Sequence, residues 1–206
     1  MSVLKTGVRI LTPAEYQSLD RVVAKPSLKV LLRALLFTGM RYQELIRLKQ
    51  NPSGFHPDKG YILVKSGKRE AVYSERYVHL TPAGVQAVKD FLADERMDYP
   101  SSAVMTKNLC AWARAAHLEA APELEGGKIS QGANAGRIRQ NVWGMSVKSF
   151  RKSWESWLAV SFPDRLEMVM LSQGHQTATS IKHYLGVPFS QAEREEIRTM
   201  TAGWMA

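Results

Sequence analysis

Four separated segments of the sequence carry side chains that suit phosphoryl transfer. Arg41 follows a predicted helix end, and Lys148 and Arg151 lie three residues apart on one helix face. His175 precedes Tyr184 by nine residues. This chemistry needs positive donors on the non-bridging phosphate oxygens and a nucleophile, and a tyrosine can attack as a phenolate when nearby cations lower its pKa. Each group alone has an ordinary structural explanation, so their order and spacing together favour the chemistry.

A lysine in a predicted turn can protonate the leaving oxygen. The polar turn at 65–70 contains Lys65 and Lys68, and either one can serve as the general acid. The reaction then needs neither a metal nor a nucleotide. No two histidines have metal-ligand spacing such as H-E-x-x-H, so we expect no metal and no other cofactor. The five histidines are His56, His79, His117, His175 and His183.

The composition indicates a folded, basic protein with a polyanionic partner. Among its 206 residues, 28 Lys and Arg exceed 19 Asp and Glu, which gives a net charge of +9. A surplus of this size suits nucleic acid, although a basic protein that binds none has the same charge. Cys110 is the only cysteine, so a reducing cytoplasm is the expected compartment. No apolar stretch approaches the roughly 20 residues that span a bilayer, so we expect no membrane association.

Helices are predicted in the first part of the chain. Thr12 is the expected N-cap of the first helix, with Pro13 at its first position and Glu15 completing a capping box. A second helix is expected from about Ser27 to a stop at Gly39. A third begins directly afterwards, with Leu45 and Leu48 on its buried face.

The middle of the chain predicts a β-hairpin followed by two helices. The segments 61–64 and 77–80 are rich in β-forming residues and flank the polar turn. Thr81-Pro82 is expected to begin a helix, and another is expected from Thr106 to about Ala120. The glycine-containing segment 121–145 is interpreted as a flexible loop.

The last third of the chain is predicted to be helical. Residues 146–160 are amphipathic, with Lys148, Arg151, Lys152 and Glu155 on the polar face. Asp164 and Glu167 are expected to cap a helix that Gly174 ends, and Tyr184 is expected on the following helix. Ser190 and Glu193 are expected to cap a final tail helix within 190–206. The predicted fold class is therefore mainly α (α+β), in one domain over 1–206 with a small antiparallel sheet.

The segments that carry these residues resemble the catalytic domain of the tyrosine recombinase, or phage integrase, family. The run 36–45 resembles the segment of the first catalytic arginine, and 146–151 resembles the second box, H/K-x-x-R. The runs 171–175 and 179–184 resemble the leucine-glycine-histidine segment and the nucleophile helix. The predicted hairpin resembles the one that carries the catalytic lysine. The resemblance extends from about residue 12 to the end of the chain.

This resemblance implies a role for each candidate residue. Arg41, Arg151 and His175 would hold the scissile phosphate with help from Lys148, and Glu44 would support Arg41. Tyr184 would form a 3′-phosphotyrosine. Lys68 is preferred over Lys65 as the general acid because it follows Gly67 directly, as in the family's Gly-Lys turn. The expected partner is double-stranded DNA, bound by a tetramer that the C-terminal tail assembles, although the tail could instead cover its own core. The candidate DNA contacts are Lys107, Arg114 and Lys152.

Two departures from the family pattern are visible. Most bacterial members have histidine where this chain has Lys148, and lysine there resembles archaeal virus and plasmid integrases. Arg41 also comes too early for the usual N-terminal core-binding domain, so that domain is expected to be absent. Three other functions are considered: a DNA-binding regulator without activity, a DNA-relaxing enzyme similar to type IB topoisomerases, and a basic RNA- or ribosome-binding helical protein.

Overall fold

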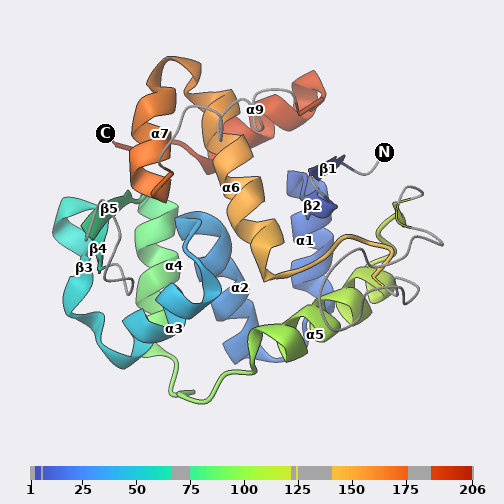
Figure 1. Ribbon diagram of the computed structural model, residues 1–206, viewed down its shortest axis with the longest axis horizontal. Coiled ribbons are helices and arrows are strands. Elements are labelled where there is room, and N and C mark those ends of the chain that lie inside the picture. The colour runs from blue at the N-terminus through green and yellow to red at the C-terminus, as the bar shows by residue number, and fades with distance from the viewer. Residues whose placement is uncertain are drawn as a thin grey trace.

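Helices dominate the computed structural model, which describes residues 3–5, 7–65, 75–121, 124, 141–175 and 187–205 (Figure 1). The α-helices are α1 (Pro13–Val22), α2 (Pro26–Thr38), α3 (Tyr42–Gln50), α4 (Pro82–Ala93), α5 (Ser102–Ala115), α6 (Val147–Ser161), α7 (Leu166–Gln173) and α9 (Gln191–Met200). The strands are β1 (Val3–Lys5), β2 (Val8–Ile10), β3 (Phe55–His56), β4 (Tyr61–Lys65) and β5 (Glu75–His79). Short 3-10 helices are η1 (Pro52–Gly54), η2 (Pro57–Lys59) and η4 (Pro163–Arg165).

The predicted capping signals of α1, α4 and α9 are confirmed. Thr12 and Glu15 form a capping box in which each side chain accepts a hydrogen bond from the other residue's backbone N–H. The Thr81 side chain accepts from Gly84 N, and Ser190 forms a capping box with Glu193. These side chains satisfy backbone donors that have no partner within the helix. The starts of these helices therefore follow directly from local sequence.

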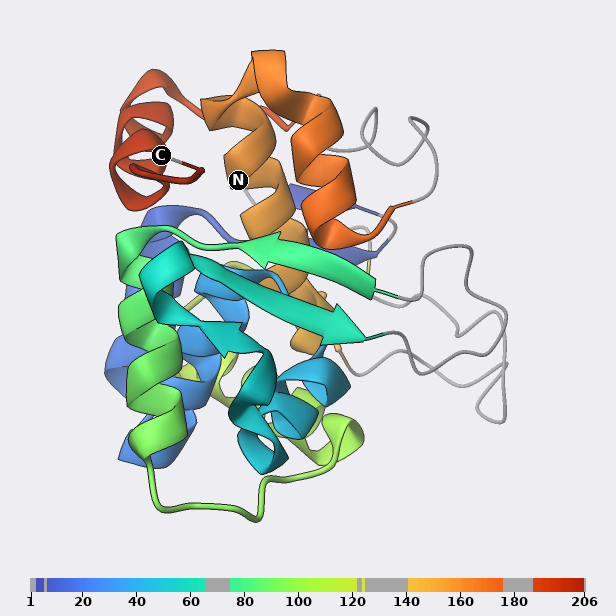
Figure 2. The same cartoon turned by 90° about the vertical axis from the view of Figure 1, so that its left-hand side faces the viewer.

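The predicted hairpin is confirmed as the antiparallel pair β4–β5. Tyr61 is opposite His79, and Lys65 is opposite Glu75. The sequence did not predict the short strand β3 on the other side of β4, nor the separate β1–β2 pair. Figure 2 shows the three-stranded sheet lying across the helices, with α7 packed beside β5. Residues 66–74 lie outside the described part of the chain, and they include Lys68.

Two predicted helix starts are wrong. Helix α5 begins at Ser102 rather than Thr106, because the Ser101 side chain caps it by accepting from Val104 N. It ends at Ala115, well before the expected Ala120. Asp164 and Glu167 form no capping box, since a 3-10 turn precedes α7 and Arg165 is at its N-cap without a side-chain hydrogen bond. The expected end of α7 at Gly174 is confirmed.

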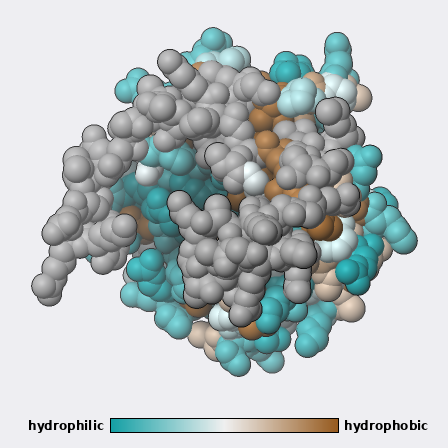
Figure 3. All heavy atoms as spheres, turned by 45° about the vertical axis from the view of Figure 1, so that its right-hand side comes forward, coloured by the Kyte–Doolittle hydropathy of each residue, from teal (hydrophilic) through white to brown (hydrophobic). Residues whose placement is uncertain are grey.

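Helix α6 is the centre of the core (Figure 1). It packs against α2, α5, α7, α9 and β2. Phe150, Trp154, Trp157 and Leu158 are fully buried on the face predicted to be apolar. Burying large aromatic side chains makes one of the largest favourable contributions to folding. Among the described residues visible in Figure 3, most are hydrophilic, and the hydrophobic ones gather mainly in a narrow strip.

The segment predicted as a loop, 121–145, is described only at its two ends. There the backbone N–H of Ala121 donates to Val142 O at 2.8 Å, and Met145 is fully buried. Cys110 of α5 is half-buried, with its Sγ 4.0 Å from Met145 O, and burial raises the pKa of its thiol. This environment is that of a structural thiol rather than a reactive one. In the described parts of the chain, no helix combines the length and apolar character that a bilayer crossing requires.

The C-terminal tail folds back on its own domain. Helix α9 packs against α6 and α1, and Ile197 is fully buried. Trp204, beyond the helix, is 1 % exposed. Its Nε1 donates to His79 O at 3.0 Å, and its ring packs against Phe162 with centroids 5.3 Å apart. The tail therefore covers its own core, which is the second of the two arrangements that the sequence left open.

Replacing Trp204 by alanine should destabilise the isolated chain. Removing a buried tryptophan leaves a cavity and an unpaired carbonyl, so we expect a loss of about 3–5 kcal/mol of unfolding free energy. Urea unfolding of W204A measures this loss, and Arg198→Ala on the exposed face of α9 is the control. Equal stability of W204A and the wild type would show that the tail does not stabilise its own domain.

Candidate active site

Arg41 is positioned by the junction between α2 and α3. Helix α2 ends at Gly39, whose φ of 61° places it in the left-handed region. A Cβ there would lie 2.6 Å from atoms of both Trp154 and Gln173, so the turn and its close packing both require glycine. The buried Met40 follows, and Arg41 is the N-cap of α3. The side chain of Arg41 is 55 % exposed and faces solvent at the site.

The carboxylate of Glu44 stabilises this junction by accepting hydrogen bonds. Its carboxylate accepts from the backbone N–H of Arg41 and from Arg41 Nη1, each at 2.8 Å. It also accepts two hydrogen bonds from Arg76 of β5, at 3.0 and 2.7 Å. Burial opposes ionisation of Glu44, but the hydrogen bonds and charges of Arg76 and Arg41 outweigh it and lower its pKa to about 2. Glu44 is therefore a permanent anion at neutral pH.

Arg151, on α6, is more deeply buried than Arg41. Its side chain is 11 % exposed, and Nε lies 2.9 Å from Glu155 Oε1. Nη1 donates to Gly39 O at 3.0 Å, and Nη2 donates to Gln173 O. Burial lowers the pKa of Arg151 from its ordinary value, Glu155 opposes that shift, and Arg41 and Arg76 add to it. These contacts connect the end of α2, α6 and the end of α7 through one guanidinium group.

His175 follows the end of α7. Gly174 ends this helix with φ of 70°, and a Cβ there would lie 2.7 Å from Arg76 Cδ, so glycine again permits close packing. His175 Nε2 lies 2.8 Å from Glu155 Oε1 and 3.5 Å from Arg151 Nη2. The imidazole is 21 % exposed. The structure thus places His175 next to Arg151.

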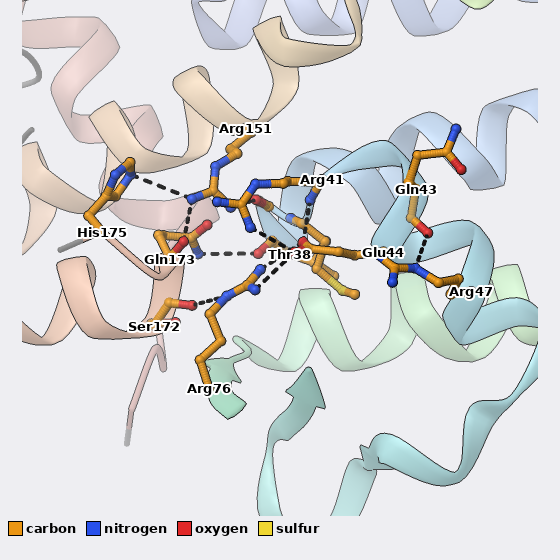
Figure 4. Close-up of polar contacts among 12 residues, drawn as sticks. Thr38, Arg41, Gln43, Glu44, Arg47, Arg76, Arg151, Ser172, Gln173 and His175 are labelled. Atoms are coloured by element: carbon orange, nitrogen blue, oxygen red, sulfur yellow. Dashed lines mark hydrogen bonds and ion pairs between the residues drawn. The ribbon is translucent and has the colours of Figure 1, made fainter. Parts of the chain in front are cut away.

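Three arginines and one histidine from four elements therefore converge at one site, which we call the cationic cluster: Arg41, Arg76, Arg151 and His175 (Figure 4). Glu44 and Glu155 are its counter-charges. A guanidinium group carries five N–H donors, and the contacts of Arg151 with Glu155, Gly39 and Gln173 use three of them. The remaining donors and the exposed Arg41 suit an anion with several oxygens, such as a phosphate. Among the described residues, no three His, Cys, Asp or Glu side chains are grouped as metal ligands.

Two of the three predicted lysines, Lys148 and Lys65, lie in the described part of the chain. Lys148 is exposed in the first turn of α6, one turn before Arg151. Lys65 ends β4 with 77 % of its side chain exposed, and its Nζ is 3.7 Å from Glu75. Lys68 and Tyr184 both lie outside the described residues. Their positions relative to the cluster thus remain expectations from sequence.

The candidate DNA-binding residues are on two helices. Lys107 and Arg114 are exposed on α5, seven residues apart and so on one helix face. The guanidinium of Arg114 lies over the Trp143 ring, 5.4 Å from its centroid. Lys152 is half-buried on α6. Lys107 and Arg114 are therefore accessible to a large partner.

The sequence did not reveal two residues of the site. Arg76 comes from β5, and nothing local links it to Glu44, which is 32 residues earlier. Glu155 was placed on the polar face of α6, but it is 2 % exposed. Its position four residues after Arg151 was an available signal, because oppositely charged residues at this spacing pair on helices.

No protein-family model matches the sequence, and a search of curated proteins finds no significant match. Solved structures do match. The XerA recombinase aligns over 94 % of this chain and 65 % of its own, with a TM-score of 0.59 and 15 % identity. The Tn1549 transposon integrase, solved in complex with transposon right end DNA, aligns over 97 % and 67 %, with a TM-score of 0.62 and 16 % identity.

The XerH site-specific recombinase, solved as a post-cleavage complex on palindromic difH substrate, aligns over 96 % of this chain and 53 % of its own, with a TM-score of 0.56 and 17 % identity. This chain thus spans less than two thirds of the XerA and XerH chains. The predicted fold class is confirmed: the chain has the fold of the tyrosine-recombinase catalytic domain, mostly helical with a small antiparallel sheet.

The low pKa of Glu44 makes a prediction about acid stability. The pKa of Glu44 is about 2 in the folded protein, below the ordinary 4.5. The ionised carboxylate therefore makes its full contribution to the free energy of unfolding above pH 4.5, and this contribution is lost as the pH falls toward 2. This difference corresponds to about 3 kcal/mol of unfolding free energy. We expect urea unfolding to show Glu44→Gln less stable than the wild type at pH 7, with the gap narrowing steadily below pH 4.5. A gap that is independent of pH between 7 and 3 would contradict the ion-pair account.

Proposed function

We propose that this chain is the catalytic domain of a site-specific DNA recombinase, or integrase, that cleaves and rejoins DNA strands through a 3′-phosphotyrosine. The observation that carries the proposal is the cationic cluster. Arg41, Arg151 and His175 come from separate elements and meet above two buried carboxylates. The fold shared with XerA, the Tn1549 integrase and XerH supports the same conclusion.

In the proposed reaction the cluster holds the scissile phosphate. Arg41 and Arg151 donate to its non-bridging oxygens, and His175 contacts it from the end of α7. Lys148, one turn before Arg151, assists from the exposed side of α6. Glu44 keeps Arg41 in position through their hydrogen bonds. Donors that are already oriented stabilise the charge that develops on these oxygens without further rearrangement.

The covalent step is an exchange of one phosphoester for another. The Tyr184 oxygen, as a phenolate, attacks phosphorus and forms the new P–O bond, while the bond from phosphorus to the 5′-oxygen breaks. The general acid, Lys68 or alternatively Lys65, gives its proton to that oxygen, and a 5′-hydroxyl leaves. A 5′-hydroxyl attacking the phosphotyrosine reverses the step and rejoins a strand. The bond energy is conserved in the phosphotyrosine, so rejoining needs no nucleotide.

The proposed partner is double-stranded DNA. The net charge of +9 favours it, because each phosphate neutralised releases counterions. Helix α5, with Lys107 and Arg114 on one face, is the proposed major-groove element, and Lys152 is a further candidate contact. Assembly of a tetramer on DNA belongs to this proposal as well, although the tail described above packs on its own domain.

Replacing Tyr184 by phenylalanine should abolish covalent attachment to DNA. The substitution removes only the attacking oxygen, so binding should remain within about twofold of the wild type. The test incubates the protein with a pool of DNA duplexes that carry a nick beside a randomised segment, and a denaturing gel then detects a protein–DNA adduct. Tyr77→Phe, on an exposed tyrosine of β5, is the matched control and should form the adduct normally. An adduct with Tyr184→Phe would refute the choice of nucleophile.

Replacing Arg41 by alanine should slow adduct formation by roughly two to three orders of magnitude, since a preorganised donor contributes about 3–4 kcal/mol at a transition state. Arg41 is largely exposed, so the fold should survive. Arg151→Ala should be at least as harmful. The matched control is Arg21→Ala, which removes the same charge from the surface of α1. Losses of less than tenfold for both variants would favour a DNA-binding regulator over an enzyme.

A further inference from the structure

We propose that Glu155 is a positioning residue that couples Arg151 to His175 and fixes which ring nitrogen of the neutral histidine carries the hydrogen. This inference rests on the proposed function, in which both partners of Glu155 contact the scissile phosphate. Its basis is a contact within the described chain: one buried carboxylate oxygen of Glu155 lies within hydrogen-bonding distance of both Arg151 and His175.

The geometry around Glu155 is that of a bridge. Its Oε1 is 2.9 Å from Arg151 Nε and 2.8 Å from His175 Nε2, so a single oxygen lies within hydrogen-bonding distance of both groups. The Glu155 side chain is 2 % exposed. Water therefore screens these contacts little, and a charge-assisted hydrogen bond is correspondingly strong.

The bridge determines where the hydrogens of His175 lie. An ionised carboxylate can only accept, so the hydrogen between Glu155 Oε1 and His175 Nε2 belongs to the ring nitrogen. Arg151 Nη2, 3.5 Å away, is also a donor and cannot bond to the same protonated nitrogen. When the imidazole is neutral, its single hydrogen is therefore on Nε2, and Nδ1 carries none. This is the logic by which a buried carboxylate orients a catalytic imidazole.

The bridge is held by the buried helix α6. Glu155 follows Trp154 and precedes Trp157 on α6, and both tryptophans are fully buried. Arg151 is held in addition by Gly39 O and Gln173 O. His175 comes directly after the helix that contains Gln173. A shift of Glu155 would thus move the imidazole relative to the guanidinium, which should alter catalysis more than DNA binding.

A purely structural role is the alternative. Glu155 could serve only to neutralise the buried charge of Arg151, whose pairing matters for folding. The two roles differ in what they predict. A structural carboxylate affects stability and every function that depends on folding. A positioning carboxylate affects the rate constant of cleavage, and does so only when His175 is present.

The first experiment reads the tautomer in the wild-type protein without DNA. Nitrogen-15 NMR correlations at a pH where the imidazole is neutral identify which ring nitrogen carries the hydrogen, and H175Q identifies the His175 signals among those of the five histidines. We expect the hydrogen on Nε2. A hydrogen on Nδ1 would overturn the inference, whatever the activity of the protein.

The second experiment measures single-turnover cleavage of the nicked duplexes. Glu155→Gln keeps the size of the side chain and an acceptor oxygen but loses the charge, and we expect its cleavage rate constant to fall roughly 10- to 100-fold, the loss that a charged hydrogen bond accounts for. Its DNA dissociation constant should change less than about threefold. Glu155→Asp, one methylene shorter, should also be slow because it cannot reach both partners. Glu167→Gln, on the exposed start of α7, makes the same charge change and should cleave normally.

A double-mutant cycle separates positioning from a general loss of structure. In the His175→Ala background, Glu155→Gln should slow cleavage by much less than it does in the wild type, because the partner of the bridge is gone. An equal, additive effect in both backgrounds, or a wild-type rate for Glu155→Gln, would overturn the inference. If the wild type itself forms no adduct, the proposed function fails, and the tautomer measurement still decides whether the bridge exists. If Glu155→Gln does not fold, that same measurement on the wild type decides the question.

Discussion

The site depends on two buried carboxylates that hold three mutually repelling guanidinium groups and one imidazole in one place. Arg41 and Arg76 share Glu44, and Arg151 and His175 share Glu155. Without these anions, repulsion among the three guanidinium groups would disfavour the folded state. Burial lowers the pKa of Arg151, and the same repulsion by the charges of Arg41 and Arg76 lowers it further. The carboxylates are shielded from water, whereas Arg41 is exposed. The charge left for an incoming anion is therefore concentrated at the surface.

Two helix ends bring these pairs together. Gly39 and Gly174 both adopt left-handed conformations that side chains disfavour, and both lack the Cβ that would collide with a member of the cluster or its neighbours. The carbonyl of Gly39 also accepts from Arg151, and that of Gln173, next to Gly174, accepts from the same guanidinium. Backbone carbonyls at helix ends thus orient the deepest cation. The two helix ends therefore hold the guanidinium group of Arg151 in a defined orientation.

The sequence predicted those parts of this arrangement that local physics determines. Caps such as Thr12 and the helix-ending glycines are decided within a few residues, and so is the alternation that forms the hairpin. The pairing of Arg76 with Glu44 is decided by tertiary packing between a strand and a helix, so it leaves no local trace. The predicted bounds of α5 are wrong at both ends. Its start is set by the cap Ser101, and just after its end His117 adopts a left-handed conformation with no glycine to signal it. The burial of Glu155 likewise follows from a partner 20 residues away.

In the function proposed above, the cationic cluster prepares a phosphate for attack by Tyr184. Mass spectrometry of the protein–DNA adduct tests it most directly, because digestion by a protease and a nuclease leaves a nucleotide on the peptide that was linked to DNA. We expect a single modified peptide with the nucleotide on Tyr184, together with a free 5′-hydroxyl at the cleavage site of the released strand. A nucleotide on any other residue, or a 3′-hydroxyl in place of the 5′-hydroxyl at the cleavage site of the released strand, would contradict the proposal.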